Sequence, residues 1–170
     1  MQSDVQQPLW ARIQAHPLDQ PDAVFPFSRR LARENDWSQD FALAVIEEYR
    51  RFVFLAMVAG HPVTPSDQVD QAWHLHLLYT QDYWGPFTAL LPHPLHHQPT
   101  AGGPEERRKF SDWYSKTLHS YRRWFGAHPP VEIWPPGVER FGRDLCWMRM
   151  NRRDYWRVPK WRTLLRRLRA

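Results

Sequence analysis

The middle of the chain repeats apolar residues at steps of three and four, and residues that favour helix starts and stops flank each repeat. This spacing places the apolar side chains along one face of an α-helix, so it constrains the fold more than any other feature. The first such segment, 38–60, begins at Ser38, whose hydroxyl can cap a helix, and is stopped by Gly60 and Pro62. The apolar positions expected to face the core are Phe41, Val45, Tyr49, Phe52, Val53 and Ala56.

A second segment with the same spacing follows directly. A helix is predicted over 64–84, with Thr64 as its cap and Pro65 in its first position. Gly85 and Pro86 are expected to end it, because neither residue favours the interior of a helix.

The remaining helical segments complete the expected fold class. A third long helix is predicted over 104–125, closed by Gly126, and shorter helical pieces are expected near 9–16 and 28–37. The alternation of apolar and polar residues that indicates strands is missing from the sequence. The sequence therefore predicts a mainly α protein.

Two proline-rich segments are expected to be non-helical. The stretch 85–103 carries four prolines and three histidines, and we expect a long loop there. The stretch 129–136 carries four prolines and is expected to be extended. Together with the charge distribution, this predicts one helical domain over 1–142 with a long Pro/His-rich loop, followed by a basic, aromatic C-terminal tail over 143–170.

Charge and composition exclude several classes of protein. Residues 1–142 hold 13 basic and 16 acidic side chains, whereas 143–170 hold 10 basic and 2 acidic ones. The single cysteine, Cys146, excludes an intrachain disulfide. The longest apolar run, Phe52–Gly60, is nine residues, whereas crossing a bilayer takes roughly 20. We therefore expect a soluble, cytoplasmic protein without a transmembrane segment. No phosphate-binding loop or dinucleotide motif occurs, so no nucleotide cofactor is expected.

Six of the nine histidines fall between residues 61 and 97, and one of them has a carboxylate partner at helical spacing. Asp70 and His74 are four residues apart, which places their Cβ atoms roughly 5–6 Å apart on one helix face. That pair suits a divalent transition metal such as Zn or Fe, or an aspartate-oriented general base. His76 lies roughly 200° around the helix from His74, so it is expected to join them only if the helix distorts.

A third ligand would have to come from the loop after the second helix. That loop offers His93, His96 and His97, and it can fold back along the helix. In the plainer alternative, Asp70 and His74 form an ordinary hydrogen bond and the loop histidines are exposed without a role. The spacing matches no closed formula such as His-Glu-x-x-His, so residue types alone leave both alternatives open.

The same residues carry a resemblance to a known family. The motif is Val69-Asp70-Gln71-Ala72-Trp73-His74-Leu75-His76, followed by Tyr83 and then Leu95-His96-His97. It resembles the signature of the glycine-rich domain-containing protein-like family, with likeness over roughly residues 40–142. The stretch from Gly102 to Gly126, together with Ile133-Trp134-Pro135-Pro136, resembles bacterial-type members of the family. The chain has seven glycines and a basic end where the plant relatives carry a glycine-rich tail. The resemblance implies that Asp70, His74, His76 and His97 are site residues, with Trp73 and Tyr83 as aromatic companions at a ligand pocket.

The basic tail is a candidate anion-binding segment. It is interpreted, in order of preference, as a helix docked on the domain, a segment that binds an anionic membrane surface or a protein partner, or a nucleic-acid-binding segment. Its candidate contact residues are Arg152, Arg153, Arg157, Lys160, Arg162, Arg166 and Arg167.

Two hypotheses of function remain. The first is a metal- or small-ligand-binding domain, with a metal-dependent enzyme as one form of it; the candidate ligands are Asp70, His74, His97, His76 and His96. The second is a non-catalytic interaction module whose tail binds a protein partner, an anionic surface or nucleic acid. Clustering of Asp70, His74 and a loop histidine around one point would favour the first.

Overall fold

The computed structural model describes residues 3–143 and Leu145, and every regular element in that range is helical. The mainly α prediction is therefore confirmed. In chain order the elements are α1 (Ser3–Ala15), α2 (Phe27–Asn35), α3 (Gln39–Val58), α4 (Asp67–Leu78), α5 (Thr80–Asp82), the π-helical turn η1 (Tyr83–Phe87), α6 (Thr88–Leu90), α7 (Gly103–Phe125) and α8 (Gly137–Gly142).

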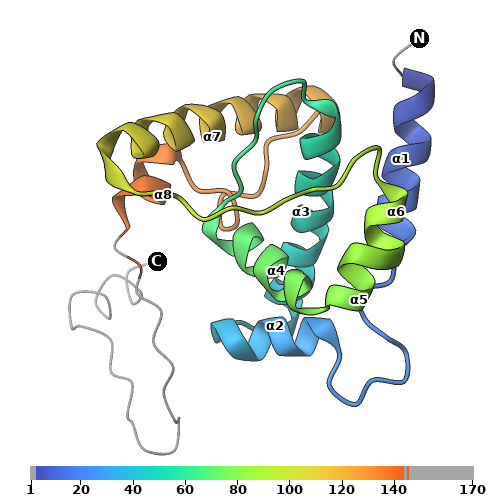
Figure 1. Cartoon of the computed structure of the whole chain (residues 1–170). Coiled ribbons are helices and arrows are strands. Elements are labelled where there is room, and N and C mark those ends of the chain that lie inside the picture. Colours follow the sequence, from blue (N-terminus) through green and yellow to red (C-terminus); the bar gives the residue numbers. More distant parts are fainter. Residues whose placement is uncertain (1–2, 144, 146–170) are drawn as a thin grey trace, which may run out of the picture.

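Helix α3 is the centre of the arrangement, and α1, α2, α4 and α7 all contact it (Figure 1). As predicted, Ser38 caps it: the Ser38 hydroxyl accepts a hydrogen bond from the Phe41 N–H at 3.2 Å. The apolar face of α3 forms much of the core, and the side chains that are at most 1% exposed include Val45, Tyr49, Phe52 and Val53.

The start of α4 differs from the prediction. The helix begins at Asp67, and its cap is Ser66, whose hydroxyl accepts from the Val69 N–H at 3.2 Å. The predicted cap, Thr64, lies outside the helix, and its N–H donates to the hydroxyl of Thr117 on α7 at 2.9 Å. A contact between distant segments therefore decides which of two capable residues becomes the cap.

The second predicted helix is also not continuous. Tyr79 adopts φ −86° and ψ 60°, which is not helical, and α4 ends at Leu78. Helical turns resume at once in α5. The chain changes direction at Tyr79, so the residues after it are not placed as one straight helix would place them.

Gly85 and Pro86 do not end the helical structure. They lie inside η1, where Gly85 departs from helical geometry with φ −101° and ψ −111°. The Thr88 hydroxyl donates to the carbonyl of Tyr83, which supplies a partner for that carbonyl. Helical turns continue to Leu90, so the long loop covers residues 91–102 rather than 85–103.

The proline-rich stretch 129–136 contains a turn, and the prediction of an extended segment was wrong. The N–H groups of Ile133 and Trp134 both donate to the carbonyl of Pro130, at 3.1 and 2.8 Å. Four non-proline residues between two proline pairs retain the N–H groups that close this turn. Ile133 and Trp134 are thereby buried in the core.

A buried carboxylate joins this turn to two helices. Glu48 on α3 accepts hydrogen bonds from the Trp134 indole N–H at 2.9 Å and the Tyr121 hydroxyl at 3.1 Å. Arg51 contacts the same carboxylate at 3.0 Å. Burial raises the pKa of Glu48 above its ordinary value, against the opposing effect of the Arg51 guanidinium and the two hydrogen bonds.

The seven basic residues proposed for the tail lie outside the described residues, so the division into 1–142 and 143–170 stays a prediction. Within the described part of the chain, the helices are too short or too polar to cross a bilayer.

Candidate metal centre

Asp70 and His74 lie one turn apart on α4, as their spacing predicts. Oδ2 of Asp70 is 3.7 Å from Nε2 of His74, which is within ion-pair range but too long for a hydrogen bond. The carboxylate is therefore near the imidazole without being tightly engaged by it.

His97 reaches the same carboxylate from loop 91–102. This loop leaves α6 and crosses the molecule to the start of α7 (Figure 1). Nε2 of His97 is 3.0 Å from Oδ1 of Asp70, and the His74 and His97 rings have centres 4.5 Å apart. The loop histidine thus completes a group with the helix pair, as hypothesised from the sequence.

Two buried aromatic residues position this loop. The Trp73 indole N–H donates to the Tyr83 hydroxyl at 2.8 Å, and that hydroxyl donates to the carbonyl of Leu95 at 2.5 Å. The Trp73 ring also packs edge-on against His97, with ring centres 4.4 Å apart. Trp73 and Tyr83 therefore lie beneath the site and hold the loop, while their role in lining a ligand pocket stays a prediction.

We call Asp70, His74 and His97 the surface group. One ligand atom from each residue lies within 4.8 Å of the others. The side chains are 22%, 47% and 16% exposed, respectively. Two imidazoles and one carboxylate could hold a metal ion, and the exposed side of the group leaves room for water or another ligand.

His76 belongs to a different group on the opposite face of α4. Its Nε2 is 2.8 Å from Oδ2 of Asp82, and Nε2 of His16 is 3.0 Å from the same oxygen. The hydroxyl of Tyr49 on α3 lies 2.9 Å from the other ring nitrogen of His76. We call His16, His76 and Asp82 the inner group, since their side chains are 8%, 1% and 23% exposed.

Burial and hydrogen bonding set the protonation of the inner group. Burial lowers the pKa of His76 to about 4, against the opposing effect of Asp82, so His76 is neutral at pH 7. Burial alone would raise the pKa of Asp82, but the hydrogen bonds from His16 and His76 lower it overall. An ionised carboxylate only accepts, so Nε2 of His76 carries the proton and Nδ1 accepts from Tyr49.

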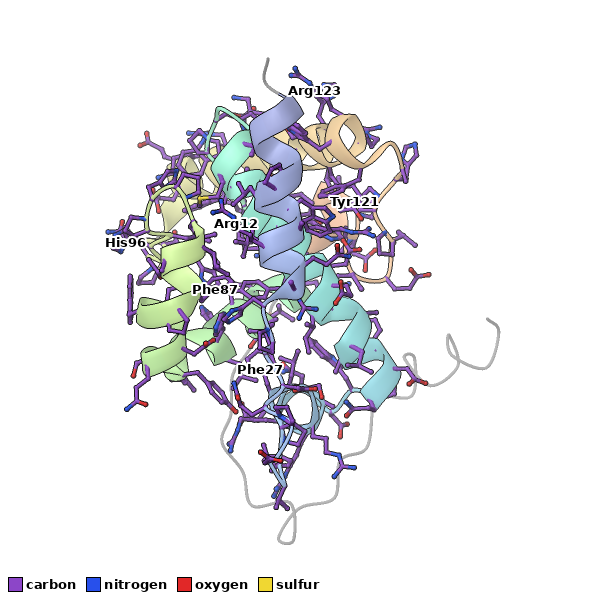
Figure 2. All side chains as sticks on the ribbon, turned by 90° about the vertical axis from the view of Figure 1, so that its right-hand side faces the viewer. Arg12, Phe27, Phe87, His96, Tyr121 and Arg123 are labelled. Carbon is purple, nitrogen blue, oxygen red and sulfur yellow. The ribbon has the colours of Figure 1, made fainter. Side chains whose placement is uncertain are left out.

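The structure does not bring His96 or His93 to either group. His96 is exposed and lies beside Trp84, with ring centres 5.4 Å apart; Figure 2 shows it at the outer edge of the molecule. His93 is exposed, and its Nδ1 is 3.3 Å from the Pro94 carbonyl. Of the five candidate ligands, three form the surface group and His76 lies in the inner group.

Sequence reasoning did not single out His16 and Asp82. His16 follows the end of α1, 60 residues before His76, and no local pattern links the two. Asp82 is six residues after His76, and residues six apart on a regular helix do not share a face. The only available signal was that His76, an imidazole predicted to face away from Asp70, needed a partner of its own.

Comparisons with known proteins give one distant relative. The chain is 24% identical over 123 residues to glycine-rich domain-containing protein 1 of Arabidopsis thaliana. The match covers 69% of this chain and 14% of that protein. No family model and no solved structure matches the chain. The comparison supports a distant relationship to a glycine-rich domain-containing protein, and the bacterial-type assignment stays a prediction.

Proposed function

We propose that the protein binds a divalent transition metal through Asp70, His74 and His97, with open coordination positions for a small ligand or substrate. The observation that carries this proposal is the convergence of a helix pair and a loop histidine on one point, with ligand atoms within 4.8 Å of one another. Such clustering is the outcome that favours the metal hypothesis over the interaction module.

The chemistry of the donors narrows the metal. Imidazole nitrogen suits Zn, Fe, Ni and Cu, whereas Mg and Ca prefer oxygen donors. Two histidines and one carboxylate are shared by hydrolytic zinc sites and non-haem iron sites, so we favour Zn or Fe. A metal held by these residues would polarise a bound oxygen or lower the pKa of bound water, which is the chemistry that a metal-dependent enzyme would use.

The exposure of the group favours an exchangeable site. His74 is 47% exposed, so a ligand can approach from its side. His97, by contrast, is held by the packed indole of Trp73 and by the loop that Tyr83 anchors. One rigid side and one open side are what a site that binds water or substrate requires.

The proposal is tested by zinc binding to full-length protein purified without a histidine tag. We expect His74→Ala to lose one tightly bound equivalent of Zn²⁺ relative to wild type, measured by elemental analysis after dialysis and by calorimetry. His119→Ala is the matched control, because His119 is an exposed histidine on α7 outside both groups. Equal zinc binding by wild type and His74→Ala would contradict the proposal.

The role of Asp70 is tested separately. Asp70→Asn keeps the shape of the side chain and removes its charge. If Asp70 is a ligand, the variant loses the surface-group zinc. If Asp70 instead orients His97 by accepting its N–H, affinity falls by roughly 10–100-fold without being abolished.

A further inference from the structure

The inner group has the same donor set as the surface group but a different setting. Both histidine Nε2 atoms point at one oxygen of Asp82, at 3.0 and 2.8 Å. One ligand atom from each of the three residues lies within 4.8 Å of the others. Two imidazoles and one carboxylate, drawn from three segments of the chain, thus converge on one point.

The two contacts to Asp82 are close to the ligand spacing that a tetrahedral ion needs. Zinc–ligand bonds of about 2.0–2.1 Å place neighbouring ligand atoms about 3.3 Å apart in a tetrahedron. The two contacts to Asp82 would each open by a few tenths of an ångström to admit the ion.

The surroundings hold both imidazoles in place. The ring of Phe87 packs against His76 and His16, with centres 4.5 and 5.2 Å apart, and Figure 2 shows Phe87 in the interior. Arg50 donates to the backbone carbonyl of His16 at 3.0 Å, which fixes the residue at the end of α1. Asp82, the most exposed member, leaves a path for an ion from solvent.

Tyr49 supplies the outer partner that metal-binding histidines normally have. A ligating imidazole usually donates its second N–H to an oxygen, and the Tyr49 hydroxyl lies 2.9 Å from Nδ1 of His76. Without metal, this hydroxyl donates to Nδ1. With metal at Nε2, the proton lies on Nδ1 and the hydrogen bond reverses.

We propose that His16, His76 and Asp82 form a second, structural zinc site that fastens the end of α1 to α4 and α5. Its fourth position is filled by water or by the second oxygen of Asp82. This site does not depend on the surface group, because the two groups share no residue and lie on opposite faces of α4.

The test uses His74→Ala as the starting protein, so that zinc at the surface group does not contribute. We expect this protein to retain one equivalent of Zn²⁺ after dialysis, and the double variant His74→Ala/His16→Gln to retain none. Glutamine keeps an N–H that can donate to Asp82 but is a poor ligand for zinc. A structural hydrogen bond would survive the substitution, and a metal site would not. Equal zinc retention by the two proteins would overturn the proposal.

Two further measurements keep the result interpretable. Zinc should raise the melting temperature of His74→Ala and leave that of the double variant unchanged, with circular dichroism confirming that both are folded. The ¹⁵N signals of His76 in His74→Ala should change from an Nε2–H to an Nδ1–H imidazole on zinc addition, a reading that needs no second substitution. An unchanged His76 tautomer at saturating zinc would overturn the proposal.

These outcomes separate the two proposed sites. Wild type should bind two equivalents, and each of His74→Ala and His16→Gln should bind one. If His16→Gln matches wild type while His74→Ala loses an equivalent, the inner site is wrong and the proposed function stands. If His74→Ala matches wild type while His16→Gln loses an equivalent, the proposed function is wrong and the inner site stands.

Discussion

The indole N–H of Trp73 and the hydroxyl of Tyr83 form a buried hydrogen bond of 2.8 Å that lies directly beneath the surface group. The same hydroxyl donates to the carbonyl of Leu95, two residues before His97. The position of His97, the loop residue proposed as a ligand, is therefore set by Trp73 on α4 and Tyr83 in η1, neither of which is itself a proposed ligand.

Tyr83→Phe should weaken zinc binding at the surface group without removing a ligand. The variant loses the hydrogen bond that holds Leu95, so His97 is less well ordered before the metal binds. We expect affinity to fall by roughly 10–100-fold, as for other outer partners of metal ligands, measured by calorimetry in the His16→Gln background. Tyr114→Phe is the matched control, since the Tyr114 hydroxyl donates to a backbone carbonyl elsewhere, that of Pro135. Similar losses in both variants would contradict a specific role for Tyr83.

The assignment of Ser66 as the cap of α4 predicts an order of stabilities. Ser66→Ala should lower the free energy of unfolding by about 1 kcal/mol, because the Val69 N–H loses its partner. Thr64→Val should be neutral or stabilising, because the Thr64 hydroxyl oxygen is buried without a hydrogen-bond partner among the described residues. Urea denaturation measures the free energy of unfolding of both variants. A larger loss of stability in Thr64→Val than in Ser66→Ala would indicate that Thr64 is the cap.

Glu48 predicts a pH dependence of stability. Its pKa is raised in the folded protein, so between the unfolded value and the folded value the native state binds the proton more readily than the unfolded state. Stability conferred through this group therefore rises as pH falls from neutral through its folded pKa toward about 4.5. Glu48→Gln lacks that contribution. We expect the free energy of unfolding of wild type minus that of Glu48→Gln to be larger at pH 4.5 than at pH 7; a difference that shrinks on acidification would contradict this.

The proposed boundary at residue 142 predicts the effect of truncation. The described core extends to Trp134, and Phe141 packs against Tyr114 with ring centres 5.9 Å apart. If the tail is an appendage to this domain, deleting 149–170 should leave cooperative thermal unfolding and zinc stoichiometry intact. Loss of the cooperative transition would show that the tail belongs to the domain.

Local signals predicted α3 and α7 well because their caps, stops and apolar faces agree. Ser38 and Gly126 act at the ends of these helices as the sequence indicates. The stretch from Thr64 to Leu90 was harder to predict from sequence, because its geometry depends on contacts with other segments. The Thr64 N–H is hydrogen-bonded to the Thr117 hydroxyl. The helix breaks at Tyr79, where the sequence has no glycine or proline that would predict a break.

In the candidate sites, too, some residues could be predicted from local spacing and others depend on contacts between distant segments. Asp70 and His74 share a face through spacing alone, so the sequence predicts their pairing. The choice of His97 over His96 depends on Trp73 and Tyr83, which select one residue of the loop by packing and hydrogen bonding. The inner group depends on the break in the helix at Tyr79. In one straight helix, Asp82 would lie about 9 Å along the axis from His76 and on another face.

Helix α4 carries proposed ligands of both groups on opposite faces within one short stretch, 70–76. Adding or removing one residue between Asp70 and His74 would turn everything beyond it by about 100°. His74 would leave Asp70, and His76 would at the same time leave Tyr49 and His16. Loop 91–102, by contrast, could change length on either side of its anchor at Leu95 and still present His97. Among relatives that keep both groups, insertions and deletions should accordingly fall in the loop and spare the helix, so a gap between Asp70 and His74 would mark the loss of both sites together.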